Sequence, residues 1–188
     1  MVTDEQTHEA WRRAAHACGA AAEALRDAHI APEALAEHLP ERGAFVWRRK
    51  ATMRPVGEVW RLGTLLLGTD GSLYAHGRST RAAERGRPNF QSESREERRE
   101  IAAAALRGGY EIGTAVNFDA VPLVTAAGVP AAVDPDHAPA GRELPIGLAD
   151  GEVRVRWRAG APLTGAPALA DFLAERAELL VHPPLLDY

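Results

Sequence analysis

From residue 44 side chains alternate with a period of two, with Phe45, Trp47, Ala51 and Met53 on one side, and this spacing predicts a β-strand. One strand is predicted from Ala44 to Arg54, and two more over 59–68 and 72–81. The dipeptide Asp70-Gly71 separates the last two and readily supplies the positive φ angles of a two-residue type I′ turn. The sequence therefore predicts a β-hairpin closed at Asp70-Gly71.

A two-residue turn also fixes the register of this hairpin. Leu67 then faces Tyr74, Leu65 faces His76 and Gly63 faces Arg78. In that arrangement His76 and Arg78 share one face of the hairpin, and a slip of one residue would send the opposite set of side chains to the core.

The N-terminal segment, residues 4–39, has helical periodicity instead. Thr3 and Gln6 fit a capping box, and a second short helix is predicted after Pro32, with Leu35 and Leu39 buried. The first helix carries small and apolar residues at steps of three and four, which form one buried stripe: Trp11, Ala14, Cys18, Ala22 and Leu25.

Two further helices are predicted. Ser94 opens a helix over residues 95–107, and Gly108 and Gly109 end it. Pro167 begins a C-terminal amphipathic helix, whose buried side is formed by Leu169, Phe172, Leu173, Leu179 and Leu180.

The segment from residue 108 to 150 is acidic and rich in proline and glycine, and no period persists in it. Short strands are predicted over 115–118 and 121–125, because long structureless loops are unusual in compact domains. Residues 152–158 alternate cleanly, which predicts a strand with Val153, Val155 and Trp157 facing inward. Trp47, Trp60 and Trp157 are all expected to be core anchors.

The order of these elements lacks the regular βαβ alternation of a parallel sheet. It favours an α+β fold, with an antiparallel sheet of about four to six strands and helices packed on one face. No linker or repeat divides the chain, so residues 1–188 are predicted to form a single domain. Its expected parts are the helical segment 4–39, the sheet region 44–81, the helix 95–107, the irregular segment 108–150, and the strand and C-terminal helix 152–181.

Composition places the chain among globular proteins, since 46% of its residues are hydrophobic and 26% are charged. No apolar stretch approaches the roughly 20 residues of a membrane-spanning helix, and the acidic start does not resemble a secretory signal. The single cysteine, Cys18, reads as a small core residue. We therefore expect a cytoplasmic protein without a membrane partner.

Motifs of the common enzyme classes are missing from the sequence. It has no glycine-rich phosphate loop, no HExxH and no serine in a GxSxG context, so no cofactor is expected and an enzymatic activity is left uncertain. Asp134, Asp136 and His137 could offer metal ligands, but Pro135 and Pro139 indicate a turn more simply, and no metal site is predicted.

Charge is distributed unevenly along the chain, although the net charge is only −4. Residues 44–81 carry seven basic and two acidic side chains. Residues 1–43 carry four basic and eight acidic side chains, and residues 108–150 carry one basic and six acidic side chains. The strands are therefore basic and their surroundings acidic. A nucleic-acid-binding protein would more often be basic overall, so such a partner is not favoured.

The polar sides of the basic strands suggest the main functional hypothesis. Arg48, Arg61, Arg78 and Arg156 could line one face of the sheet and capture carboxylate or phosphate groups. The chain would then be a non-catalytic module that binds an anionic small molecule or an acidic segment of a partner protein. The alternative is that these arginines are solvated, or pair with the acidic helices.

Two other functions stay open. In a small enzyme His76 would act as general base, with Arg78 or Arg61 holding the substrate anion, although His76 could equally be a partly buried packing residue. In a structural protein the chain would form a homodimer through a sheet edge or the apolar tail. The tail is expected to dock onto its own domain or onto a partner subunit through Leu185, Leu186 and Tyr188.

Overall fold

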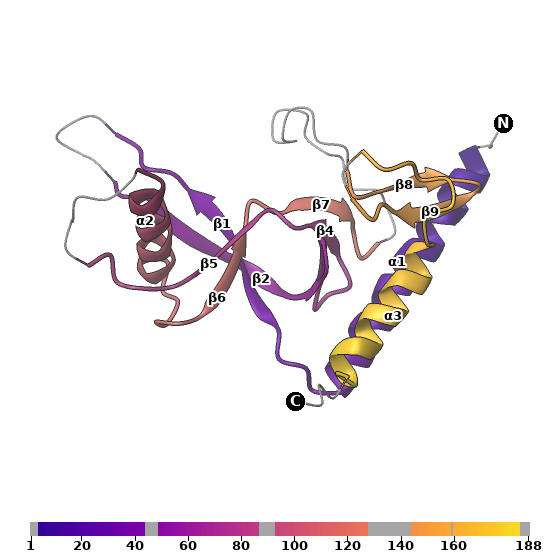
Figure 1. Ribbon diagram of the computed structural model, residues 1–188, viewed down its shortest axis with the longest axis horizontal. Coiled ribbons are helices and arrows are strands. Elements are labelled where there is room, and N and C mark those ends of the chain that lie inside the picture. Colours follow the sequence, from indigo (N-terminus) through magenta and orange to yellow (C-terminus); the bar gives the residue numbers. More distant parts are fainter. Residues whose placement is uncertain (1–3, 44–48, 87–92, 128–143, 159, 185–188) are drawn as a thin grey trace. The chain divides into compact units, whose positions relative to one another are not determined.

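The computed structural model describes residues 4–43, 49–86, 93–127, 144–158 and 160–184 (Figure 1). Within these ranges the chain forms two compact units, and buried apolar side chains cluster separately in each. The sequence predicts one core instead. The α+β class is confirmed, while the proposal of a single domain over residues 1–188 stays a prediction.

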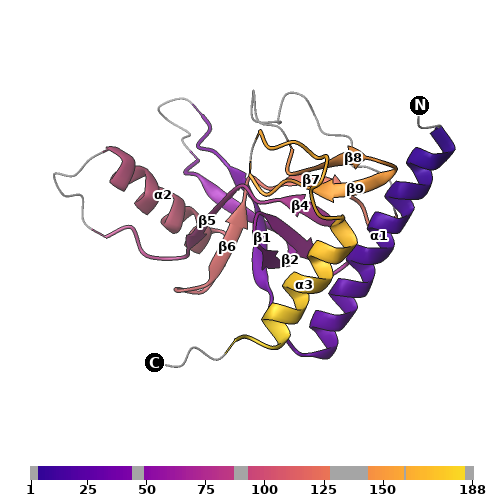
Figure 2. The same ribbon diagram turned by 45° about the vertical axis from the view of Figure 1, so that its right-hand side comes forward.

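The first unit contains two helices and most of the shorter strands. Helices α1 (Asp4–Asp27) and α3 (Leu169–Val181) lie side by side in both views (Figures 1 and 2). Cys18, Leu25 and Leu173 belong to their shared core and are completely buried. The strands of this unit are β3 (Leu65–Gly68), β4 (Leu73–Ala75), β7 (Val121–Val124), β8 (Ile146–Ala149) and β9 (Glu152–Val155).

Helix α1 confirms most of the predicted stripe, because Ala14, Cys18, Ala22 and Leu25 are buried, while Trp11 is partly buried against the same core. The helix ends where His29 adopts a left-handed conformation, with φ of 56°, and the Ile30 amide donates to the Leu25 carbonyl.

The second unit is built around helix α2 (Glu93–Arg107). Met53, Ile101 and Phe118 are part of its buried cluster. Its strands are β1 (Glu33–Leu39), the first part of β2 (Thr52–Leu62), β5 (Arg78–Arg81) and β6 (Ala115–Phe118).

Helix α2 ends at the predicted glycines. Gly109 has a φ of 94°, its amide donates to the Leu106 carbonyl, and the Tyr110 amide donates to the Ala105 carbonyl, as in a Schellman motif. The helix begins at Glu93, so Ser94 lies in its first turn and is not the residue before it.

In the described part of the chain the larger sheet has seven strands in the order β5-β6-β1-β2-β3-β4-β7, and β8 and β9 form a second sheet. The pairing is mostly antiparallel, as predicted, with β1 and β6 parallel. The number of strands therefore exceeds the expected range. The helices do not share one core, because α1 and α3 pack in the first unit and α2 in the second.

The helix predicted after Pro32 is wrong, because these residues form β1. This strand pairs with β2 on one side and with β6 on the other, which satisfies its backbone groups in both directions. A register shift between Leu35 and Ala36 lets both side chains be buried. Pairing between distant segments outweighs the local helical spacing.

The strands predicted over 44–54 and 59–68 have different limits. Residues 44–48 lie outside the described residues, and β2 runs without interruption from Thr52 to Leu62. A turn at Gly63, whose φ is 65°, then separates β2 from β3.

The hairpin between β3 and β4 is confirmed, but its register differs by one residue from the prediction. The loop contains three residues rather than two, because the Gly68 amide donates to the Ser72 carbonyl and the Gly71 amide to the Gly68 carbonyl. Gly71 takes the left-handed position, and the Asp70 carboxylate accepts bonds from the Ser72 amide and hydroxyl. The observed pairs are Leu65 with Ala75, Leu66 with Tyr74 and Leu67 with Leu73.

The predicted pairing of Gly63 with Arg78 is therefore wrong. Gly63 lies in the turn before β3, while Arg78 begins β5 and is paired with Phe118 of β6. The chain leaves the hairpin after Ala75, so the strand predicted over 72–81 is divided into β4 and β5.

Strands β6 and β7 confirm the two short strands predicted in the irregular segment. Strand β9 ends at Val155, however, and Trp157 is 68% exposed instead of buried. The predicted burial of Leu179 and Leu180 at the end of α3 is also wrong, since these side chains are 40% and 37% exposed.

Candidate anion-binding recess

The four arginines proposed from the sequence are distributed over both units. Arg61 and Arg156 belong to the first unit and Arg78 to the second, while Arg48 lies outside the described residues. Whether they form one face of the sheet stays a prediction.

Arg78 is occupied by contacts within the second unit. Its Nη2 lies 2.9 Å from Oε1 of Glu97 on α2, its Nη1 lies 3.9 Å from a carboxylate oxygen of Asp119, and its guanidinium lies 5.2 Å from the ring centre of Phe118. These contacts agree with the alternative interpretation, in which outward arginines pair with acidic helices.

His76, the candidate base, is half-buried between β4 and β5. It does not line any of the recesses described below. Its role as a general base stays a prediction.

A recess of about 250 Å³ in the first unit has the composition of an anion site. Three segments form it: the turn between β2 and β3, the residues that follow β9, and the outer side of α3. We call it the arginine recess, and its principal lining residues are Gly63, Arg156, Trp157, Phe172, Glu175 and Arg176.

Arg156 stabilises the wall of the arginine recess. Its Nε donates to the Leu144 carbonyl at 3.2 Å, and its Nη1 donates to the Ala161 carbonyl. The first bond joins the residues after β9 to those before β8, and the second lies within the residues after β9. Among the candidate arginines in the described residues, Arg156 lines this recess, and Arg61 and Arg78 do not.

Arg176 has a different environment. Its guanidinium lies 5.3 Å from the ring centre of Phe172, one helical turn earlier in α3. Among the residues that the structure describes, no carboxylate lies within ion-pair distance of it, and its Nε is buried without a hydrogen-bond partner. A buried donor without a partner costs about 1–3 kcal/mol, so the described protein groups leave the guanidinium of Arg176 incompletely satisfied.

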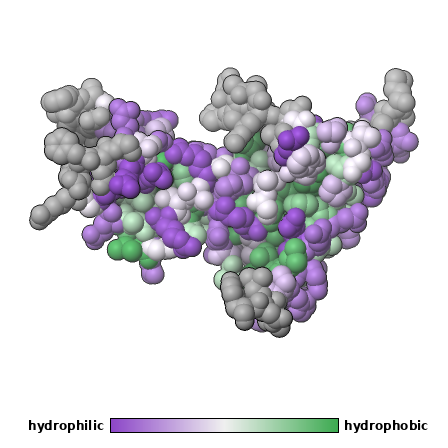
Figure 3. Space-filling view, viewed as in Figure 1, coloured by the Kyte–Doolittle hydropathy of each residue, from purple (hydrophilic) through white to green (hydrophobic). Residues whose placement is uncertain are grey.

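Trp157 stands at the edge of the same recess. Its large exposure is unusual, because tryptophan is highly buried on average. The guanidinium of Arg158 covers the indole at 4.3 Å from the ring centre. Figure 3 shows hydrophobic residues reaching the surface beside hydrophilic ones where Figure 1 places α3.

The sequence analysis missed Arg176, Phe172 and Trp157 as site residues. Trp157 is exposed because β9 ends at Val155 and the alternation stops there, whereas Phe172 is partly buried against the first core and also lines the recess. The adjacent residues Trp157 and Arg158, just after a strand, were the one local signal of an exposed aromatic site.

A larger recess of about 610 Å³ lies between the start of α1 and the turn from β8 to β9. Its arginines already have partners: Arg12 and Arg13 contact Glu9, and Arg13 donates to the Gly151 carbonyl at 2.9 Å. Glu5 and Asp150 add negative charge to its lining. An anion would therefore be attracted less strongly there than to the arginine recess.

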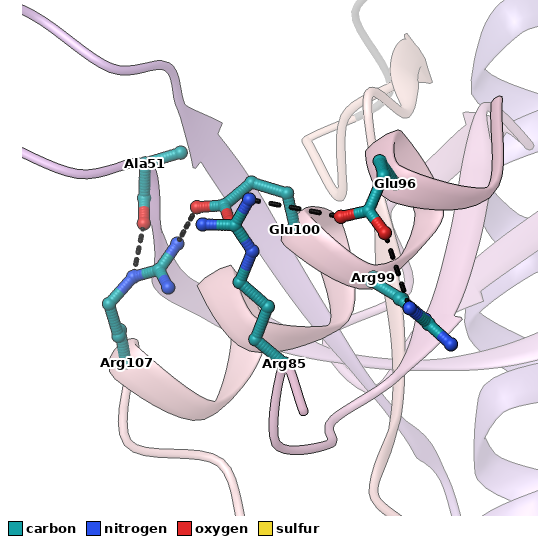
Figure 4. A network of polar contacts seen from close by, with 6 residues as sticks. All are labelled: Ala51, Arg85, Glu96, Arg99, Glu100 and Arg107. Carbon is teal, nitrogen blue, oxygen red and sulfur yellow. Dashed lines mark hydrogen bonds and ion pairs between the residues drawn. The ribbon is translucent and has the colours of Figure 1, made fainter. Parts of the chain in front are cut away.

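The second unit contains a polar network on α2 (Figure 4). Arg107 donates to the Ala51 carbonyl at 2.7 Å and to Glu100 at 2.6 Å, and Arg85 lies near both Glu100 and Glu96. Each arginine of this network contacts a glutamate, so we assign the network to stabilising the helix and not to binding a ligand.

Cys18 is not a candidate nucleophile. Burial raises the pKa of its thiol to about 12, which leaves very little reactive thiolate at neutral pH. Asp134, Asp136 and His137 lie outside the described residues, as does the tail from Leu185 to Tyr188. Within the described ranges no group of three or more His, Cys, Asp or Glu residues could hold a metal ion.

Comparisons with protein-family models, curated proteins and solved structures find no match to this chain. None of the helices in the described residues has the length and apolar character needed to cross a bilayer.

Proposed function

We propose that this chain is a non-catalytic binding module that holds a small anionic molecule in the arginine recess. The observation that carries the proposal is the environment of Arg176, which lines the recess and has only the ring of Phe172 as its partner among the described residues. A guanidinium without a carboxylate partner can form a bidentate pair with a carboxylate or a phosphate.

The charge of the recess supports this ligand class. Arg156 and Arg176 outnumber the single acidic lining residue, Glu175, and Arg158 lies next to the rim on Trp157. Phe172 and Trp157 also reduce access of water to the guanidinium groups, and such desolvation strengthens their attraction for an anion.

The size of the recess favours a small molecule over an acidic partner segment. Sites for drug-sized ligands measure roughly 300–1,000 Å³, and this recess, at about 250 Å³, is smaller. Binding of an acidic segment, as well as formation of a homodimer, stays an alternative prediction.

The proposal is tested by replacing Arg176 with glutamine, which keeps most of the side chain and removes its charge. Carboxylated and phosphorylated metabolites are screened by thermal shift in low-chloride buffer, and each one that raises the melting temperature is then titrated. We expect the variant to weaken binding about 10- to 100-fold, because hydrogen bonds to charged groups contribute about 1.5–3 kcal/mol.

Arg54→Gln is the matched control, since Arg54 lies in the second unit, its side chain is 65% exposed and it pairs with Glu37. It removes the same charge and should leave the affinity unchanged. The proposal would be refuted if a ligand bound the wild-type protein and Arg176→Gln with equal affinity. It would also be refuted if Arg176→Gln and Arg54→Gln lost affinity by the same factor.

A further inference from the structure

We infer that the ligand of the arginine recess is a single-ring aromatic monoanion, with its ring on the indole of Trp157 and its carboxylate on Arg176. This inference rests on the proposed function and specifies the class of ligand. Three features carry it: an exposed aromatic face, a guanidinium that lines the recess without a carboxylate partner, and a small volume.

The exposed aromatic face belongs to Trp157. Trp60 is 3% exposed and donates to the Ile30 carbonyl at 2.8 Å, so this tryptophan acts as a core anchor. Trp157 instead leaves most of its indole accessible, although burial of an aromatic side chain is strongly favourable. Arg158 stacks on the indole, which holds the ring at the rim and leaves surface for a second planar group.

The charges around Arg176 limit the ligand to one carboxylate. Arg156 already donates to two backbone carbonyls, and Arg158 stacks on Trp157 and does not line the recess, so Arg176 is the principal cation for a ligand inside it. Glu175 lines the same recess and would repel a second negative charge.

The volume and the walls limit the rest of the ligand. About 250 Å³ accommodates one ring more readily than a fused or extended ring system. The lining also includes Val155, Pro167 and Phe172, which offer apolar contact to a ring. Gly63 adds no side chain to this space, and its φ of 65° is strained for other residues.

The test compares benzoate with cyclohexanecarboxylate, a monoanion of the same carbon number that lacks an aromatic face. Each is titrated into the full chain, and the indole N–H signal of Trp157 is followed by NMR and identified by its loss in Trp157→Leu. We expect benzoate to bind about 5- to 10-fold more tightly than cyclohexanecarboxylate. In Trp157→Leu, titrated by calorimetry, this preference should disappear.

The outcomes separate this inference from the proposed function. Equal affinities of the two acids, with binding that still depends on Arg176, would overturn the aromatic preference and leave the anion module standing. If each acid binds the wild-type protein and Arg176→Gln with the same affinity, the aromatic preference and the proposed anion module are both overturned. The comparison of ligands uses the wild-type protein, so it does not depend on how Trp157→Leu folds.

A second arm tests the limit to one carboxylate. Phthalate should bind more weakly than benzoate, and Glu175→Gln should reduce the difference, because it removes the repelling charge. Tighter binding of phthalate than of benzoate to the wild-type protein would contradict the inferred monoanion.

Discussion

At the scale of single residues, close approaches of the backbone depend on glycine. Gly108 follows α2, and a Cβ at this position would overlap the carbonyl of Met53 on β2. A backbone oxygen cannot move aside as a flexible side chain can. Gly19 is the opposite case, since it lies on the exposed side of α1 and a Cβ there meets nothing within 4 Å.

These two glycines give a matched pair of substitutions. Gly108→Ala should lower the free energy of unfolding by about 1–3 kcal/mol, because the end of α2 must shift away from β2. Gly19→Ala should raise it by about 0.5–1 kcal/mol, because alanine favours the helix. Urea denaturation measures both, and the same sign of effect in both variants would contradict this account.

Cys18 gives a prediction about pH at the same scale. The thiol pKa is about 12 in the folded protein and 9.0 without burial, so the folded state holds the proton more strongly. The contribution of this group to stability is complete below pH 9 and is lost as the pH rises towards 12. Between pH 9 and pH 12 the melting temperature should fall more steeply in the wild type than in Cys18→Ala. Parallel curves of melting temperature against pH would contradict this role of the thiol.

At the scale of elements, helix α2 is attached to β2 by polar contacts as well as by its alanines. Arg107 bridges the last turn of the helix to the Ala51 carbonyl and also contacts Glu100, while Oε2 of Glu100 lies 3.3 Å from Nε of Arg85 (Figure 4). Arg99 contacts only Glu96 in this network, within the helix itself.

Arg107→Gln should therefore destabilise the protein more than Arg99→Gln. We expect a loss of about 1–2 kcal/mol for the first, since the Ala51 carbonyl loses its side-chain donor and Glu100 keeps only its contact with Arg85 in this network. The second should stay within about 0.5 kcal/mol of the wild type. Amide exchange in α2 would report the difference, and equal protection in the two variants would show that the bridge to Ala51 contributes little.

At the scale of the whole molecule, the buried apolar side chains of the described residues form two clusters. Leu173 is fully buried in the first, and Phe118 is 1% exposed in the second. Truncation of either to alanine removes apolar contacts from one cluster only, at a cost of about 2–5 kcal/mol.

Hydrogen exchange can show how far the two units unfold independently. Leu173→Ala should first reduce protection in α1 and α3, and Phe118→Ala should first reduce it in α2 and β6, because each variant weakens its own cluster. Uniform loss of protection in both variants would instead favour the single cooperative domain that the sequence predicts.

The sequence by itself determined the elements whose signals are local. The stripe of α1, the glycines after α2 and the turn residues Asp70 and Gly71 act on neighbours a few positions away, so their effect does not depend on the rest of the fold. The α+β class follows from the order of these signals.

The tertiary structure decided what depends on distant partners. Residues 33–39 become a strand because β2 and β6 pair with them, and Trp157 becomes exposed because β9 ends at Val155 and the alternation stops there. The arginine recess joins Gly63, Trp157 and Arg176, which are far apart in the sequence. No pattern of neighbouring residues predicts that these three residues line one recess, because burial and pairing between distant segments determine their positions.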